Sequence, residues 1–279
     1  MRRKILVPTD FSINAENAIQ YAIELYKNEE CDFYILNAFF VIGFATDNMM
    51  VPEVGEIAYK SAKETSEEGL LITSNKFKNK NISRHEFFTI SKFSSLLNSI
   101  DEVVEENNID MIIMGTQGVT NAKGIIFGSN TVMIMEKERS CPVLAIPSEV
   151  TYTKPKEIVF PTSFEKEYNK AEINYLIEIA AMNTAAIRVL HVNGDEPLNK
   201  TQENNKKQLL TFFKGVDYSF HTIYNVELQI ALDCFVQSRD SDMIAFINKK
   251  HGFLDTIFTR HLVQDLGYRS KVPVLTLHD

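Results

Sequence analysis

An internal repeat is the feature that most restricts the fold of this 279-residue chain. Three matched segments in one order indicate a duplicated unit. The sequence therefore predicts two tandem domains, residues 1–149 and 150–279, with a polar linker over residues 148–156. The matched pairs are residues 5–11 (ILVPTDF) with 158–164 (IVFPTSF), 110–114 (DMIIM) with 242–246 (DMIAF), and 141–146 (CPVLAI) with 272–277 (VPVLTL).

Strand-like and helical patterns alternate along the first copy. Short apolar runs typical of buried strands lie at residues 4–8, 32–39, 85–89, 110–114 and 142–146. Alternation of this kind implies parallel pairing with right-handed crossovers, and hence an α/β fold with a doubly wound sheet.

Helical periodicity fills the intervals between these runs. Ser12 is a plausible N-cap for a helix over residues 15–26, a second helix covers about residues 55–78, and residues 43–54 between strand and helix look irregular. A later helix extends to about residue 137. The helix before the fourth strand is predicted from Phe93, Leu96, Leu97, Ile100, Val103 and Val104.

A glycine-punctuated loop follows the fourth strand and leads into a helix. The loop contains Gly115 and Gly118 and ends at Gly128, which is followed by three polar residues that can cap the helix or bond a phosphate oxygen, Ser129, Asn130 and Thr131. Glycines allow the backbone to approach a ligand, and the free N–H groups of a helix N-terminus favour an anion. The pattern is neither a Walker A motif nor a GxGxxG fingerprint, and turn glycines are the alternative interpretation. Our hypothesis is a cradle for a nucleotide phosphate.

The second copy lacks this cradle. Ser163 stands at the position of Asp10, and Gly252 is the only glycine between residue 247 and Gly267. The second copy is also shorter, and the missing residues fall in the segment that matches residues 40–60. Joint loss of Asp10 and the glycines suggests that they serve one site, although Asp10 could instead cap the first helix or its turn.

Composition excludes several classes of protein. A net charge of −8 and a pI near 5.4 argue against nucleic acid as the main partner. No apolar run reaches the ~18 residues of a membrane span, and the start of the chain does not resemble a signal peptide. Three widely spaced cysteines suggest buried thiols in a reducing cytoplasm.

The histidines and an apolar excursion leave alternatives open. The six histidines form no short ligand pair, so no metal site is expected. His191 occupies the position of Asn37 in the repeat, and it either faces a pocket or is simply packed. Residues 39–54 could be a lid, a patch for another protein or an ordinary packed segment.

These motifs together resemble the universal stress protein family, in particular its tandem members. The resemblance rests on KILVPTDFS at residues 4–12, the pattern G-x2-G-x9-G-S-N at residues 115–130, and CPVLAIP at residues 141–147. It implies two tandem Rossmann-like domains of the adenine nucleotide alpha hydrolase-like type, each a five-stranded parallel sheet flanked by helices. It also implies ATP, alone or with Mg²⁺, as the ligand of the first domain.

The resemblance further implies roles for particular residues. Asp10 would approach the ribose, Ala38 would offer backbone groups to the adenine, and no catalytic or metal-binding residue is assigned. The last strands of the two domains would pair within the chain, and a homodimer through the same strands is possible. The implied nucleotide-binding residues are Pro8, Thr9, Asp10, Ala38, Gly115, Gly118, Gly128, Ser129 and Asn130.

The function expected from these observations is ATP binding by a stress-response sensor or regulator, with a degenerate second domain. One alternative is a slow ATP hydrolase, although the loop offers no evident base or arginine. The other is an interaction module that needs no nucleotide.

Overall fold

The computed structural model describes residues 2–41, 52–78, 84–116, 128–194, 196–248 and 270–278. The first half contains β1 (Arg3–Pro8), α1 (Ile13–Leu25), β2 (Cys31–Phe39), α2 (Pro52–Lys78), β3 (His85–Phe93), α3 (Leu96–Asn107), β4 (Met111–Gly115), α4 (Ser129–Lys137) and β5 (Val143–Ile146). The second half contains β6 (Glu157–Pro161), α5 (Lys170–Asn183), β7 (Ala186–Asn193), α6 (Lys200–Phe212), β8 (Tyr218–Tyr224), α7 (Leu228–Arg239), β9 (Met243–Asn248) and β10 (Val274–His278).

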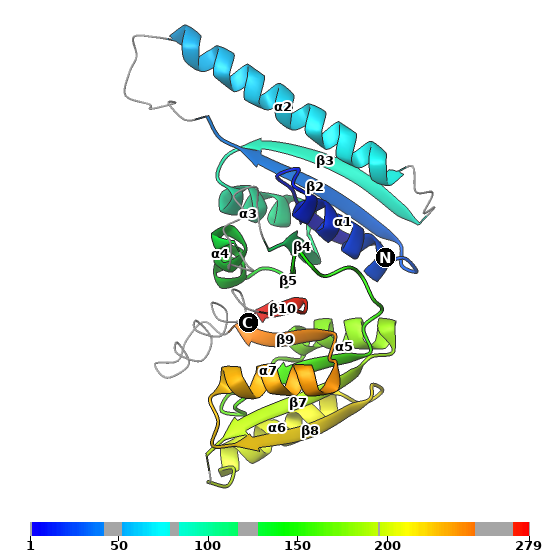
Figure 1. Ribbon diagram of the computed structural model, residues 1–279, viewed down its shortest axis with the longest axis vertical. Coiled ribbons are helices and arrows are strands. Elements are labelled where there is room, and N and C mark those ends of the chain that lie inside the picture. Colours follow the sequence, from blue (N-terminus) through cyan, green and yellow to red (C-terminus); the bar gives the residue numbers. More distant parts are fainter. Residues whose placement is uncertain are drawn as a thin grey trace.

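All these strands belong to one sheet, in the order β3-β2-β1-β4-β5-β10-β9-β6-β7-β8 (Figure 1). Each half supplies five consecutive strands that pair in parallel. The halves meet where β5 and β10 pair antiparallel, with Leu144 opposite Leu275. The predicted α/β fold is confirmed, and the last strands of the two halves do pair within the chain. The domain limits at residues 149 and 150 stay a prediction.

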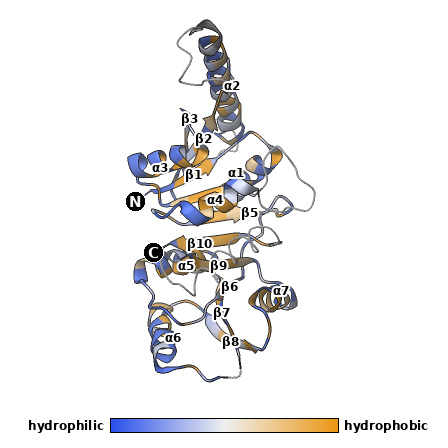
Figure 2. Cartoon of the chain, turned by 90° about the vertical axis from the view of Figure 1, so that its left-hand side faces the viewer, coloured by the Kyte–Doolittle hydropathy of each residue, from blue (hydrophilic) through white to orange (hydrophobic). Residues whose placement is uncertain are grey.

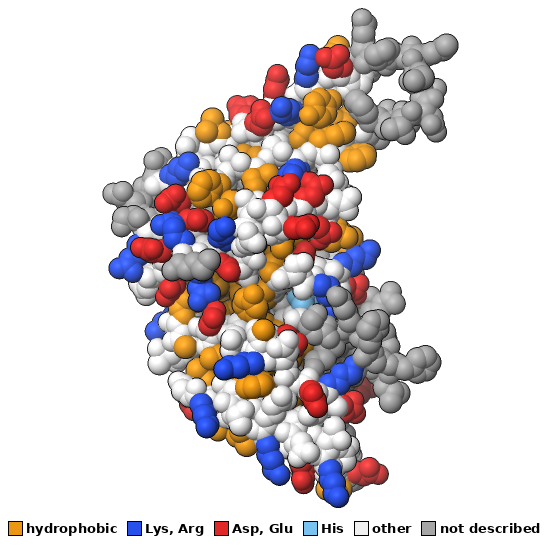
Figure 3. Space-filling view, turned by 180° about the vertical axis from the view of Figure 1, so that it is seen from behind, with side chains coloured by type: hydrophobic (Ala, Val, Ile, Leu, Met, Phe, Trp, Pro, Cys, Tyr) orange, Lys and Arg blue, Asp and Glu red, His pale blue; other side chains and the backbone are white. Residues whose placement is uncertain are grey.

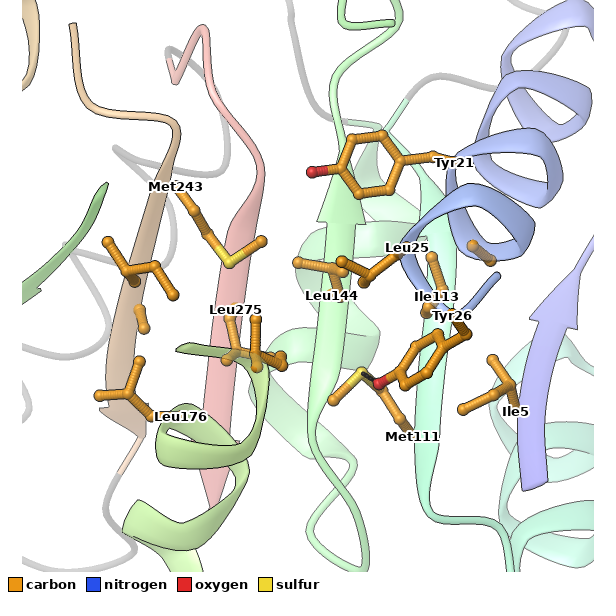
Figure 4. Close-up of a cluster of buried hydrophobic side chains, with 14 of the residues drawn as sticks. Ile5, Tyr21, Leu25, Tyr26, Met111, Ile113, Leu144, Leu176, Met243 and Leu275 are labelled. Atoms are coloured by element: carbon orange, nitrogen blue, oxygen red, sulfur yellow. Dashed lines mark hydrogen bonds between the residues drawn. The ribbon is translucent and has the colours of Figure 1, made fainter. Parts of the chain in front are cut away.

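Helices cover both faces of the sheet, and each face carries a core that crosses from one half to the other. One core contains Leu144 and Leu275 together with buried residues of α1, α2, α5 and α6. The other contains Val143 and Val274 with residues of α3, α4 and α7. Figure 4 shows side chains of β5 and β10 packed in one cluster. Burial of each such leucine contributes about 1.5–3 kcal/mol, so the two halves stabilise one another.

The repeat extends to the details of the backbone. Phe11 and Phe164 both follow the first strand of their half with positive φ, 63° and 58°. In each case the preceding threonine, Thr9 or Thr162, accepts the phenylalanine N–H at its Oγ1. The second strands are tied to these turns as well, because Asn37 Nδ2 donates to the Thr9 carbonyl at 2.7 Å.

His191 takes the role of Asn37 in the second half. Its Nδ1 lies 2.8 Å from the carbonyl oxygen of Thr162, and a carbonyl can only accept, so Nδ1 carries the proton. The side chain is buried, and its Nε2 has no partner among the described residues. Of the two interpretations of His191, the packed and hydrogen-bonded one is therefore correct.

Helix α2 is the main asymmetry between the halves. It has 27 residues whereas its counterpart α6 has 13, which confirms where the second copy is shorter. Its C-terminal part packs on the sheet through Leu70 and Phe77, while Ile57 near its start is 68% exposed. Figure 2 shows the other end of α2 extending away from the sheet.

Several predicted boundaries were wrong. Phe93 is the last residue of β3, not part of a helix face, because β3 follows β2 to the pair Phe39–Phe93 and Ser95 caps α3 by accepting the Asn98 N–H. Residues 52–54, predicted to be irregular, begin α2. Residues 42–51 of the same segment lie outside the described residues, so the alternatives for residues 39–54 stay open.

The predictions made from composition about membrane spans, charge and cysteines can be compared with the structure. No helix in the described ranges is long and apolar enough to cross a membrane. On the face seen in Figure 3, cationic and anionic side chains are interspersed. All three cysteines are free thiols, and Cys31 and Cys141 are buried as predicted, but the prediction of a buried thiol is wrong for Cys234, which is exposed. The cytoplasmic location and the exclusion of nucleic acid stay predictions.

The buried His191 predicts a pH-dependent stability. Burial, and secondarily the charge of Lys206, lowers its pKa below the ordinary 6.5. The unfolded chain therefore binds a proton before the folded chain does, and stability present above pH 6.5 is lost as the pH falls. We expect His191→Asn, which copies Asn37, to reduce the loss of unfolding free energy between pH 7 and pH 5, measured by urea unfolding.

The size of the effect is limited to about 1.4 kcal/mol per pH unit for one proton. His221→Asn is the control, because that ring is only partly buried and should carry less of the slope. An unchanged pH slope in His191→Asn would show that the neutral histidine is not a determinant of stability.

Candidate functional site

A cavity of about 210 Å³ opens at the carboxyl ends of β1, β2 and β4. Every predicted site residue within the described ranges lines it, and Gly118 lies outside those ranges. The lining also contains Thr131, the third polar residue after Gly128, and four residues that the sequence analysis did not identify, Ala15, Leu96, Met114 and Thr116. Thr116 follows Gly115 directly and could have been found from the motif, whereas Leu96 comes from the start of α3 and is brought in only by the fold.

Gly115 lets β4 pass closely beneath the start of α1. A Cβ at this position would lie 2.8 Å from the backbone oxygen of Asn14, a distance that real Cβ atoms do not show. The glycine is therefore required by close approach of two backbones. The second half has Ile247 at the same register of its strand, and there the helix begins only at Lys170, after a longer loop.

The N-terminus of α4 presents unused donors to the cavity. Gly128 is the N-cap and provides no side chain, and its own N–H donates to the Thr116 carbonyl. The N–H groups of Ser129 and Asn130 have no acceptor among the described residues, as expected in the first turn of a helix. Thr131 Oγ1 donates to the Gly115 carbonyl at 2.8 Å and fixes α4 to β4. Together with the helix dipole, this end of α4 can bind an anion.

Thr116 adds a buried hydroxyl to the same wall. Its residue surface is 0% exposed, and Oγ1 has no hydrogen-bond partner in the described part of the chain. A buried hydroxyl without a partner costs free energy, so a ligand bound in the cavity would gain by accepting a hydrogen bond from it.

Thr9 and Asp10 form the turn on the opposite side of the cavity. Asp10 Oδ1 accepts the Ser12 N–H at 3.1 Å, so this carboxylate does hold the turn, as the alternative interpretation proposed. Asp10 is also exposed and lines the cavity. The two roles are compatible, because a carboxylate has two oxygens with several acceptor sites.

Ala38, near the carboxyl end of β2, lines the cavity on the β2 side. The Thr9 N–H donates to the Leu36 carbonyl at 2.8 Å, just past the end of β1. Backbone groups alternate in direction along a strand, so the N–H and C=O of Ala38 point the same way as those of Leu36 and extend beyond β1. This places one donor and one acceptor at the edge of the cavity.

The charge of the site is unusually low for an anion-binding surface. Asp10 is the sole charged side chain among the described lining residues. The described residues contain no group of three or more potential metal-ligating side chains. Within the described lining, attraction for an anion therefore comes from N–H groups, hydroxyls and the helix dipole.

The equivalent turn of the second half is occupied by its own side chains. The Tyr168 hydroxyl bonds to Thr162 Oγ1. Gln202 and Asn205 of α6 donate to the carbonyls of Ser163 and Phe164. These bonds fix the longer loop to α6 and replace the open arrangement of the first half.

Comparisons with known proteins agree with this asymmetry. The sequence profile of the universal stress protein family matches residues 1–147. Universal stress protein MJ0577 of Methanocaldococcus jannaschii is 30% identical over 169 residues, which cover 52% of this chain and 95% of that protein. Universal stress protein MJ0531 of the same organism is 28% identical over 154 residues, covering 52% and 81%.

Solved structures resemble the whole chain. The crystal structure of a universal stress protein from Archaeoglobus fulgidus superposes with a TM-score of 0.68 at 16% identity, covering 99% of this chain and 96% of that one. A putative universal stress protein from Pseudomonas aeruginosa gives 0.61 at 13% identity, covering 99% and 93%. At these identities the likeness supports the fold.

The close approach at Gly115 predicts a large penalty for a single methyl group. We expect Gly115→Ala to lower the free energy of unfolding by about 1–3 kcal/mol, because the Asn14 carbonyl belongs to the backbone and cannot rotate away. Urea unfolding monitored by circular dichroism measures this. Gly194→Ala is the matched control, since a Cβ there meets nothing within 4 Å and the substitution should be neutral or stabilising. Equal effects of the two substitutions would contradict the packing argument.

Proposed function

The chain belongs to the universal stress protein family, and on this premise we propose that its first half binds ATP in the cavity between β1, β2, β4 and α4. We further propose that nucleotide occupancy is the signal of a stress-response regulator. The units are residues 1–149, which carry the site, and residues 150–279, which act as a structural or regulatory partner without a cradle.

The observation that carries this proposal is the position of the open α4 N-terminus. In the first half, the strand order 3-2-1-4-5 reverses between β1 and β4, and the cavity lies at that point. Open α/β sheets bind ligands at such switch points, outside the carboxyl ends of the strands. The N–H groups of Ser129 and Asn130 and the Thr116 hydroxyl have no partner within the described ranges, and they would supply donors for phosphate oxygens.

The other end of the cavity suits a nucleoside. Ala38 offers a backbone donor and acceptor, which together match the adjacent acceptor and donor on the edge of adenine. Asp10 lines the cavity at the carboxyl end of β1, where its carboxylate would accept a hydrogen bond from a ribose hydroxyl. Met114 and Leu96 provide apolar surface between the polar groups.

Mg²⁺ fits this site if the phosphate oxygens of the nucleotide are its main ligands. Mg²⁺ keeps several waters and typically needs only one or two carboxylates in addition to phosphate oxygens. Asp10 is the one carboxylate among the described lining residues, so the cation would be held chiefly by the nucleotide. When bound, it would neutralise phosphate charge that no described lysine or arginine of the lining offsets.

Sensing is favoured over hydrolysis by the chemistry of the lining. Phosphoryl transfer needs a positioned base and charge stabilisation of the transferred group. The described lining offers hydroxyls and N–H groups but neither histidine nor arginine. We therefore propose retention of ATP and an ordered site as the output.

The role of Thr116 gives a direct test. We expect Thr116→Val to weaken ATP binding about tenfold, because it removes a hydroxyl that would donate to a charged phosphate. Calorimetric titration measures the Kd, and the thermal midpoint should not fall, since the hydroxyl has no protein partner in the described chain.

Thr276→Val is the matched control for that test. Thr276 is also 0% exposed, and its Oγ1 has no partner among the residues that the structure describes, but it lies on β10, outside the cavity lining. Its ATP affinity should equal that of the unaltered protein. Failure of the unaltered protein to bind ATP, or equal affinity in both variants, would contradict the proposed site.

The proposed part of Mg²⁺ gives a second test. Chelation with EDTA should weaken ATP binding while leaving adenosine binding unchanged, because the cation offsets only phosphate charge. Competitive titration with both ligands, with and without EDTA, measures this. Equal ATP affinity in the two conditions would show that the N–H groups and helix dipole suffice alone.

A further inference from the structure

Helix α4 connects the cavity to the second half of the chain. Its N-terminus lines the cavity, and its last carbonyls accept hydrogen bonds from Asn248, the final residue of β9. Asn248 Nδ2 lies 2.9 Å from the Met135 oxygen and 3.3 Å from the Glu136 oxygen. Arg139, just after α4, donates to the Asn248 carbonyl and, at 3.0 Å, to the Glu136 carbonyl.

The hydrogen bonds from Asn248 satisfy carbonyl groups at the C-terminus of α4. The last four carbonyl groups of a helix accept no hydrogen bond from the helix itself. If such a carbonyl is buried without another donor, the fold loses free energy. Asn248 is 5% exposed, so its amide is not replaced by water without rearrangement. One side chain of the second half thus caps the C-terminus of the helix whose other end lines the first-half site.

Asn248 occupies the position in the second half that Thr116 occupies in the first. β4 and β9 pair in the same register with the first strand of their half, Met111 with Ile5 and Met243 with Ile158. Thr116 lies five residues after Met111 and Asn248 lies five residues after Met243, so the two positions correspond. The position that lines the cavity in the first half has become, in the second half, a contact to α4.

We propose that Asn248 is a positioning residue for the phosphate-binding end of α4, so that the second half sets the nucleotide affinity of the first. The proposal rests on the proposed function for its ligand. α4 has only nine residues and is fixed at both ends, by Thr131 on Gly115 and by Asn248. A helix this short moves as a unit, so loss of the C-terminal cap displaces the N–H groups of Ser129 and Asn130.

Thermodynamic linkage makes this coupling reciprocal. If Asn248 improves ATP binding by some factor, bound ATP strengthens the contact between α4 and Asn248 by the same factor. The end of β9 would then respond to occupancy of a site in the other half of the chain. A partner domain that lost its own cradle thereby keeps a role in nucleotide sensing.

The test compares two substitutions in the full-length chain. Asn248→Leu removes the cap. Asn183→Leu is the matched control, because Asn183 is equally buried at 4% exposure and its Nδ2 donates to a helix carbonyl, Ile179, at 2.9 Å, but within α5. For each variant, hydrogen exchange of α4 is measured without ligand and the ATP Kd is measured by calorimetry. The thermal midpoint of each variant is measured as well.

Asn248→Leu should accelerate exchange throughout α4 and raise the ATP Kd about fivefold, whereas Asn183→Leu should lower the thermal midpoint without either effect. Unchanged α4 exchange in Asn248→Leu, or equal changes in both variants, would overturn the positioning role. If the unaltered protein binds no ATP, the proposed function and the effect on affinity are both wrong, while α4 exchange still decides whether Asn248 positions the helix.

Discussion

Antiparallel pairing of β5 with β10 is the interaction on which the rest of the structure depends. It joins two parallel five-stranded units into one sheet and merges their cores on both faces. Because the pairing is antiparallel, the carboxyl ends of the two sets of strands point in opposite directions. The end of β9 therefore lies beside the C-terminus of α4 rather than beside the cavity, and one helix comes to contact both the candidate site and the other half.

The duplicated halves kept the features that determine the fold and diverged in those that form the cavity. Both turns after the first strand retain a threonine hydroxyl and a phenylalanine with positive φ. The close approach that Gly115 permits is replaced by Ile247 and a longer loop, which Tyr168 and α6 fill. In the second half, side chains of α6 donate to the backbone carbonyls of this turn, Gln202 to Ser163 and Asn205 to Phe164.

The chemistry of the first-half site favours binding with little charge. Its described lining joins a helix N-terminus, a buried hydroxyl and strand-end backbone groups, with Asp10 as the single charged side chain. Such a site can hold phosphate through dipoles while leaving the state of the ligand unchanged. This is the physical basis for the proposed sensor, in which the ordering of short elements such as α4 would carry the information.

The sequence by itself determined the fold class, the duplication, most strand positions and those cavity-lining residues that follow strands in one motif. These are local signals, since apolar runs, glycine spacing and Ser12 or Gly128 at helix starts act within a few residues. Phe93 was misassigned because its spacing to Leu96 and Ile100 is also helical, and only pairing with Phe39 decides for a strand.

Only the tertiary structure decided which distant residues meet. Leu96 joins the cavity, Asn14 restricts Gly115, and Asn248 caps α4 across the junction of the halves. These contacts depend on strand order and on the antiparallel pairing of β5 with β10, which no local pattern encodes.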